Sequence, residues 1–183
     1  MRVLVACECS GTVRNAFIAR GHMAVSCDLQ PSEVNGPHFR GDVLSILDYG
    51  WDLMVAHPPC TALAVSGSAH FEQKLLNGEQ KKGIEFFLTL ARAAIPRIAL
   101  ENPKSIMSTL YMPPTQIIHP WQFGHGEKKL TCLWLKNLSP LRPTQVVQER
   151  EERVALESPS KRRAKIRSRT FEGIAAAMAE QWG

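Results

Sequence analysis

Several features that define membrane and secreted proteins are absent from this sequence of 183 residues. No run of about 18 apolar residues occurs, so no membrane-spanning helix and no membrane partner are predicted. Residues 1–7 read directly as a strand and carry no signal-peptide pattern. The five cysteines are odd in number, and their spacing is not that of a disulfide framework. We therefore expect a protein of the reducing cytoplasm.

The sequence also has little that indicates a metal site, a repeat or a second domain. Its one close cysteine pair, Cys7-Glu8-Cys9, has a single residue between its members and no second pair beside it. This is not a zinc signature, so no metal is expected. No internal repeat, low-complexity tract or linker interrupts the chain. The length and an apolar content of 44% predict one domain, residues 1–183, around one core.

The charge balance favours a polyanionic partner. The formal net charge is +5, and the basic residues gather in the segment 158–169, which holds no acidic residue. A solvated surface run is the alternative, but the position near the end of a compact domain favours contact with nucleic acid. The basic residues of the segment are Lys161, Arg162, Arg163, Lys165, Arg167 and Arg169.

Short apolar runs alternate with stretches of helical periodicity along the chain. This alternation predicts an α/β fold with a doubly wound, mostly parallel sheet. The helix that begins at residue 13 is expected to be capped by Thr12, and the polar residues 66–78 are expected to form a mobile segment. Strands are predicted at residues 2–7, 25–28, 52–56, 97–100 and 130–135, and the main helices at 13–20, 79–94 and 170–182.

Reactive side chains follow three of these strands. Asp28 ends the second strand, Cys60 comes directly after the Pro58-Pro59 stop of the third, and Glu101 follows the fourth. The carboxyl ends of parallel strands meet at one edge of the sheet, where ligands bind in open α/β folds. A thiol there is a candidate nucleophile, although a buried structural cysteine is an open alternative. A carboxylate such as Asp28 is how Rossmann-like folds hold ribose hydroxyls.

Two of these motifs resemble those of the cytosine-C5 DNA methyltransferases. Pro59-Cys60 resembles the Pro-Cys nucleophile motif of that family. Glu101-Asn102-Pro103 resembles its Glu-Asn-Val motif, with proline in place of valine. The resemblance covers most of the chain and implies a Rossmann-like class I methyltransferase fold that uses S-adenosylmethionine.

The resemblance also implies further site residues. The final helix, 170–182, resembles the one that packs back on the cofactor side. Lys128 and Lys129 resemble a basic motif before a late strand and would contact nucleic acid. Asp28 would hold the ribose of the cofactor, and Asp42 would approach its adenine. The expected cofactor-binding set is Ser10, Gly11, Thr12, Asp28, Asp42 and Pro58.

The chemistry that the resemblance implies suits these residue types. Carbon 5 of cytosine accepts a methyl group only after a thiolate has added to carbon 6, a step helped by a proton at ring nitrogen 3. Cys60 would supply the thiolate and Glu101 the proton, while Asn102 would fix the geometry around Glu101. The substrate would be DNA in which the cytosine is flipped out or already single-stranded.

The departures from the family pattern leave other functions open. Residues 136–169, between the late strand and the final helix, are too few for the usual target-recognition domain, so a partner protein could supply sequence recognition. An enzyme that modifies cytosine in RNA or in a free nucleotide is one alternative, and a non-catalytic nucleic-acid-binding relative is another. His57 replaces a small or apolar residue of the motif, and a Cys60–His57 hydrolase pair is the third alternative.

Overall fold

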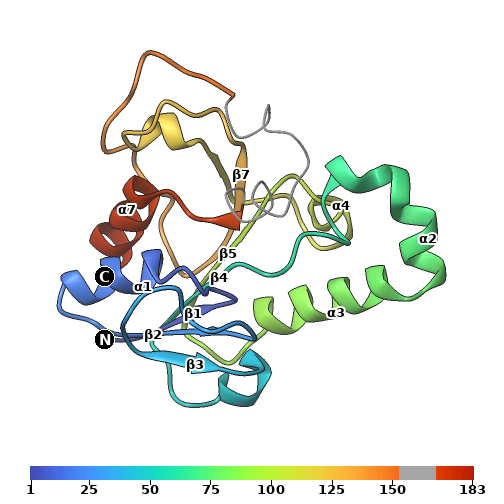
Figure 1. The fold of residues 1–183 in the computed structure, drawn as a ribbon, viewed down its shortest axis with the longest axis horizontal. Coiled ribbons are helices and arrows are strands. Elements are labelled where there is room, and N and C mark those ends of the chain that lie inside the picture. The colour runs from blue at the N-terminus through green and yellow to red at the C-terminus, as the bar shows by residue number, and fades with distance from the viewer. Residues whose placement is uncertain (153–167) are drawn as a thin grey trace.

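The computed structural model describes residues 1–152 and 168–183, which form a seven-stranded sheet with helices on both faces (Figure 1). No helix in these ranges is long and apolar enough to cross a membrane. The strands are β1 (Arg2–Ala6), β2 (Met23–Asp28), β3 (His38–Arg40), β4 (Leu53–Ala56), β5 (Arg97–Asn102), β6 (Gln116–Ile118) and β7 (Thr131–Lys136). The α-helices are α1 (Thr12–Ala19), α2 (Phe71–Leu76), α3 (Glu79–Ala91), α4 (Met107–Leu110) and α7 (Glu172–Trp182), and the 3-10 helices are η1 (Val43–Ile46), η2 (Val65–His70) and η3 (Pro120–Gln122).

The strand order is β3-β2-β1-β4-β5-β7-β6. Strands β1 to β5 run parallel, whereas β7 is antiparallel to both of its neighbours, β5 and β6. This confirms the predicted doubly wound, mostly parallel α/β sheet. The chain builds outward in opposite directions from β1 and β4, so the order reverses between these two strands. The carboxyl ends of β1 and β4 therefore flank the crevice in which open α/β sheets bind their ligands.

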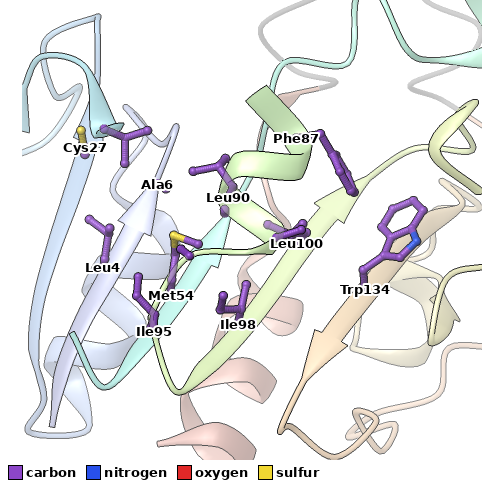
Figure 2. Close-up of a cluster of buried hydrophobic side chains, with 14 of the residues drawn as sticks. Leu4, Ala6, Cys27, Met54, Phe87, Leu90, Ile95, Ile98, Leu100 and Trp134 are labelled. Carbon is purple, nitrogen blue, oxygen red and sulfur yellow. The ribbon is translucent and has the colours of Figure 1, made fainter. Parts of the chain in front are cut away.

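The two faces of the sheet carry separate core layers because strand side chains alternate. Leu4 and Ala6 of β1 lie on the face covered by α3, whereas Val3 and Val5 lie on the face covered by α1 and α7. Both faces are buried, which explains the continuous apolar runs in the sequence. Figure 2 shows the α3 layer, in which the ring of Phe87 meets Trp134 edge-on with 5.2 Å between ring centroids.

The start of α1 differs from the prediction, because Thr12 does not cap it. Gly11 is the N-cap residue, with a left-handed φ of +74° and no side chain to offer. The buried carboxylate of Glu8 takes over instead, accepting the amides of Val13 at 2.7 Å and Arg14 at 3.2 Å. A carboxylate at this end of a helix also interacts favourably with the helix dipole. The prediction missed Glu8 because it lies outside the usual N-cap position.

Other differences arise where pairing or packing overrides local pattern. The edge strands β3 and β6 were not predicted, since three residues carry almost no periodic signal. The segment 66–78, which was predicted to be mobile, contains α2 and most of η2. Helix α3 ends at Ala91, earlier than expected. Strand β5 runs on to Asn102 because its last residues pair with β7, and this puts Glu101 inside the sheet.

A fully buried arginine ties α1 to the loop that follows β2. Arg14 has no exposed surface. Its guanidinium donates to Ser26 Oγ at 3.0 Å and to Ser32 Oγ at 3.1 Å. It also donates to backbone carbonyls of the same loop, those of Val34, Asn35 and Pro37. The two terminal nitrogens of the guanidinium, which carry four of the five N–H donors of arginine, serve this set of acceptors, and Nε donates to Asn15.

We expect Arg14→Ala to lower the free energy of unfolding by about 3 kcal/mol or more, since it leaves a cavity and removes the donor of one buried and several part-buried hydrogen bonds. Arg20→Ala, at the C-cap of the same helix, is the matched control. Arg20 is half-exposed and pairs with Glu180 at 3.2 Å, a contact expected to contribute less than about 1 kcal/mol. Urea denaturation of both variants measures the difference, and equal losses would contradict this role for Arg14.

Candidate active site

A cavity of about 130 Å³ lies at the carboxyl ends of the central strands. Its walls come from the turn after β1, from Asp28 at the end of β2 and from His57 just after β4, which is the crevice that the strand order predicts. Glu33 lies on the loop that Arg14 binds. Glu33 and Arg169 complete the lining and form an ion pair with each other. The remaining lining residues are Cys7, Glu8, Cys9, Ser10, Ser168 and Thr170.

The predicted cofactor residues divide into two groups. Ser10 and Asp28 line the cavity. The other four predicted residues, which do not line it, are Gly11, Thr12, Asp42 and Pro58. Gly11 and Thr12 shape the start of α1 behind it. Asp42 caps η1, with Oδ1 accepting the Leu44 amide at 3.0 Å. The carbonyl of Pro58 accepts a hydrogen bond from Asn102. Binding by any of the six stays a prediction.

The segment that carries Cys60 is held against the end of β5. The His57 amide donates to the Ala6 carbonyl at 2.9 Å and so extends the pairing of β4 with β1 by one residue. The two prolines then end the strand, because they cannot donate to the ladder. The side-chain amide of Asn102, 1% exposed, donates to the Pro58 carbonyl at 2.8 Å. Asn102 therefore positions the turn that carries Cys60, and its expected effect on the geometry around Glu101 stays a prediction.

A second contact joins the same two strand ends through side chains. His57 Nδ1 lies 3.0 Å from Glu101 Oε2, and the two side chains are only 9% and 12% exposed. From the sequence we predicted only a pairing of His57 with Cys60. The sequence did hold one indication that His57 is unusual, because a histidine replaces a small or apolar residue of the Pro-Cys motif. The contact itself could not be predicted, since the two residues lie 44 positions apart.

The surroundings of Glu101 favour its charged form. Burial by itself would raise the pKa of this carboxyl, but the hydrogen bond from His57 and the nearby charges of Lys129 and His57 outweigh burial and lower the pKa. Lys129 was predicted to contact nucleic acid, and the structure places its charge near the carboxyl. Lys128 points to a different partner, Glu152, at 4.0 Å.

Three of the other cysteines are held as unreactive thiols. Burial, together with the charge of Asp28, raises the pKa of Cys7 to about 12 and that of Cys27 to about 11. Burial raises the pKa of Cys132 as well. Nucleophilic attack needs the thiolate, so these three are poor candidates. Cys60 is partly exposed and sits beyond the strand end, where a substrate can reach it.

Most of the predicted nucleic-acid-binding segment lies outside the described residues. This applies to Lys161, Arg162, Arg163, Lys165 and Arg167, whose role stays a prediction. Arg169, at the end of the segment, is described. It lines the cavity and pairs with Glu33.

No family model matches the sequence, and no curated protein matches it. Among solved structures, the fold is similar to a putative DNA modification methyltransferase encoded within an Escherichia coli prophage, with a TM-score of 0.55 and 12% identity over 87% of this chain. It is also similar to the methyltransferase EhMeth of Entamoeba histolytica, with a TM-score of 0.52 and 13% identity over 83% of the chain. The chain has a Rossmann-like α/β fold, and these two methyltransferases share that fold. It spans 55% and 57% of the length of these two proteins.

Proposed function

We propose that this protein is an S-adenosylmethionine-dependent methyltransferase that adds a methyl group to carbon 5 of cytosine in DNA through a covalent adduct on Cys60. The observation that carries the proposal is a pair of hydrogen bonds that join the Cys60 turn to the end of β5. The Asn102 side chain donates to the Pro58 carbonyl, and His57 Nδ1 forms a hydrogen bond with the Glu101 carboxyl. These contacts keep a thiol and a carboxyl on adjacent strand ends, beside the ligand crevice of the sheet.

The residues can perform the first chemical step as follows. A bond forms between Cys60 Sγ and carbon 6 while the double bond between carbons 5 and 6 shifts to carbons 4 and 5. The π electron pair of the double bond between carbon 4 and nitrogen 3 moves onto nitrogen 3, which takes a proton from Glu101. Carbon 5 is then electron-rich enough to accept a methyl group. Transfer of the carbon 5 proton to a water molecule and departure of the Cys60 thiolate restore the double bond between carbons 5 and 6, and nitrogen 3 returns its proton to Glu101.

The cavity residues fit the proposed cofactor. When bound, S-adenosylmethionine supplies an electrophilic methyl group. It carries a sulfonium, an ammonium and ribose hydroxyls, and the carboxylate of Asp28 lines the cavity where it can meet these groups. The carboxylates of Glu8 and Glu33 add negative charge to the lining while they bind the start of α1 and Arg169. In addition, the buried Nε2 of His57, which lines the cavity, has no hydrogen-bond partner in the described part of the chain. A polar ligand atom would satisfy it.

DNA is the proposed substrate for two reasons. One of the similar structures is described as a DNA modification methyltransferase, and the net charge of +5 favours a polyanion. A base held by both Cys60 and Glu101 must leave the stack, so a flipped or single-stranded cytosine is expected. We retain the expectations of a single domain, a cytoplasmic location and a partner protein that reads the target sequence.

Transfer of labelled methyl groups to DNA, to RNA and to deoxycytidine monophosphate tests the proposal. Label that appears on carbon 5 of cytosine in DNA supports it. Label on RNA or on the free nucleotide alone would move the assignment to another substrate class. Binding of S-adenosylmethionine without transfer to any of the three would mean that the chain is a non-catalytic relative.

We expect Asp28→Asn to weaken S-adenosylmethionine binding by about 10- to 100-fold, the usual effect of losing a charged hydrogen-bond acceptor. The asparagine can still accept the Gln30 amide, as Asp28 Oδ1 does at 2.8 Å, so the turn should persist. Asp52→Asn is the matched control, because Asp52 lies before β4, where its Oδ2 accepts the Arg2 amide at 2.6 Å, and it does not line the cavity. Cofactor binding by this variant should change less than about twofold. Calorimetric titration measures both, and the reverse order of effects would contradict the structure-based assignment.

A further inference from the structure

His57 connects the two halves of the candidate site. Its Nδ1 contacts Glu101, the proposed acid, while its ring lines the cavity proposed for the cofactor. Its Nε2 is buried and has no hydrogen-bond partner in the described ranges. An unsatisfied buried ring nitrogen is costly for a residue that serves packing alone. The mechanism proposed above assigns no step to His57. We therefore ask what the contact between His57 and Glu101 contributes.

Glu101 cannot supply the proton at nitrogen 3 without help. Its surroundings favour the carboxylate, which accepts hydrogen bonds but has no proton to give. Histidine is the side chain that ordinarily exchanges protons between pH 5 and 8, and His57 Nδ1 lies 3.0 Å from the carboxylate. Lysine ordinarily keeps its proton at neutral pH, so Lys129 contributes charge rather than a proton.

We propose that His57 is the positioning residue of Glu101 and that the two side chains act as one acid, in which His57 resupplies the proton that Glu101 gives to the base. This inference rests on the proposed cytosine chemistry. As the bond between Cys60 Sγ and carbon 6 forms, nitrogen 3 takes one proton from Glu101. Glu101 takes one from His57, and the imidazolium becomes a neutral imidazole. When the thiolate leaves, the proton returns from nitrogen 3 to the pair.

Other charged and titratable groups surround the pair and act on it together. Lys129 and Cys132, before and within β7, lie near Glu101. The groups that line the cavity with His57 are Cys7, Glu8, Cys9, Asp28, Glu33 and Arg169. The variants below leave all of these groups in place, so changes in titration report the contact between His57 and Glu101.

The first test needs no methyl transfer. Carbon-13 NMR follows the titration of the Glu101 carboxyl, identified as the resonance that is absent from Glu101→Gln. His57→Phe keeps a ring but removes the hydrogen-bond donor. In this variant we expect the pKa of Glu101 to rise by about one unit or more, because burial still raises this pKa and the hydrogen bond that lowers it is lost. A smaller rise would overturn the coupling. Since the isolated protein is used, this result stands even if the proposed function fails.

The second test uses the dependence of kcat on pH. In His57→Gln the amide can still donate to Glu101 but cannot resupply a proton. We expect kcat at neutral pH to fall about 10- to 100-fold, and the alkaline limb of the profile to move to lower pH, because Glu101 then titrates alone. KM for the DNA should stay within about threefold. A lower kcat with an unmoved alkaline limb, or full rescue by glutamine, would show a structural role only and overturn the proposal.

Discussion

Cys60→Ala is expected to abolish methyl transfer while it leaves binding of S-adenosylmethionine near the wild-type value. Without the thiolate no adduct forms at carbon 6, and carbon 5 does not become nucleophilic. The cofactor should be unaffected because Cys60 is not among the residues that line the cavity. A transfer assay with labelled methyl groups and a calorimetric titration of the same preparation measure the two effects. Substantial turnover by this variant would falsify the proposed mechanism.

Cys27→Ala is the matched control for this experiment. Cys27 is a buried thiol on β2 whose pKa is raised to about 11, so its removal should cost some stability and little activity below the unfolding transition. A covalent trap gives an independent check. DNA that contains 5-fluorocytosine should form a stable adduct on Cys60, because fluorine cannot leave carbon 5 as a proton does. Mass spectrometry of the digested protein then locates the modified residue, and an adduct on another cysteine would move the nucleophile.

Glu101→Gln is expected to slow methyl transfer by about 10²- to 10⁴-fold, the usual range for the loss of a positioned acid. The amide can still form hydrogen bonds to the base and to His57, so binding of the base should suffer much less than the rate. Single-turnover kinetics with a pre-bound DNA substrate separate the two quantities. A loss of similar size in binding and in rate would mean that Glu101 only shapes the site.

Glu85→Gln provides the control for the change of charge. Glu85 is an exposed residue of α3 that faces Lys81 at 3.9 Å, far less buried than Glu101. This variant should keep wild-type kinetics, because exposed pairs of this kind contribute little. Unfolding of Glu101→Gln in urea should also be recorded, since a large loss of stability would account for lost activity without any catalytic role.

Much of the fold follows from local patterns in the sequence. The apolar run Leu53–Ala56 and the two prolines after it mark a buried strand and its end, because proline cannot donate to a ladder. The periodicity of α3 and α7 reports the faces that they bury against the sheet. The short strands β3 and β6 escaped prediction, since three residues at a sheet edge are defined by their partners rather than by their own pattern.

For the candidate site, the sequence by itself determined which side chains stand at the strand ends: Asp28, Cys60, Glu101 and Asn102. Only the tertiary structure decided what each of them contacts. It assigned Asn102 to the Pro58 carbonyl, His57 to Glu101, and Glu8 in place of Thr12 to the start of α1. The reason is physical. Strand ends and turns are set by propensities over a few residues, whereas a hydrogen bond between residues 44 positions apart depends on how β4 and β5 pair in the sheet.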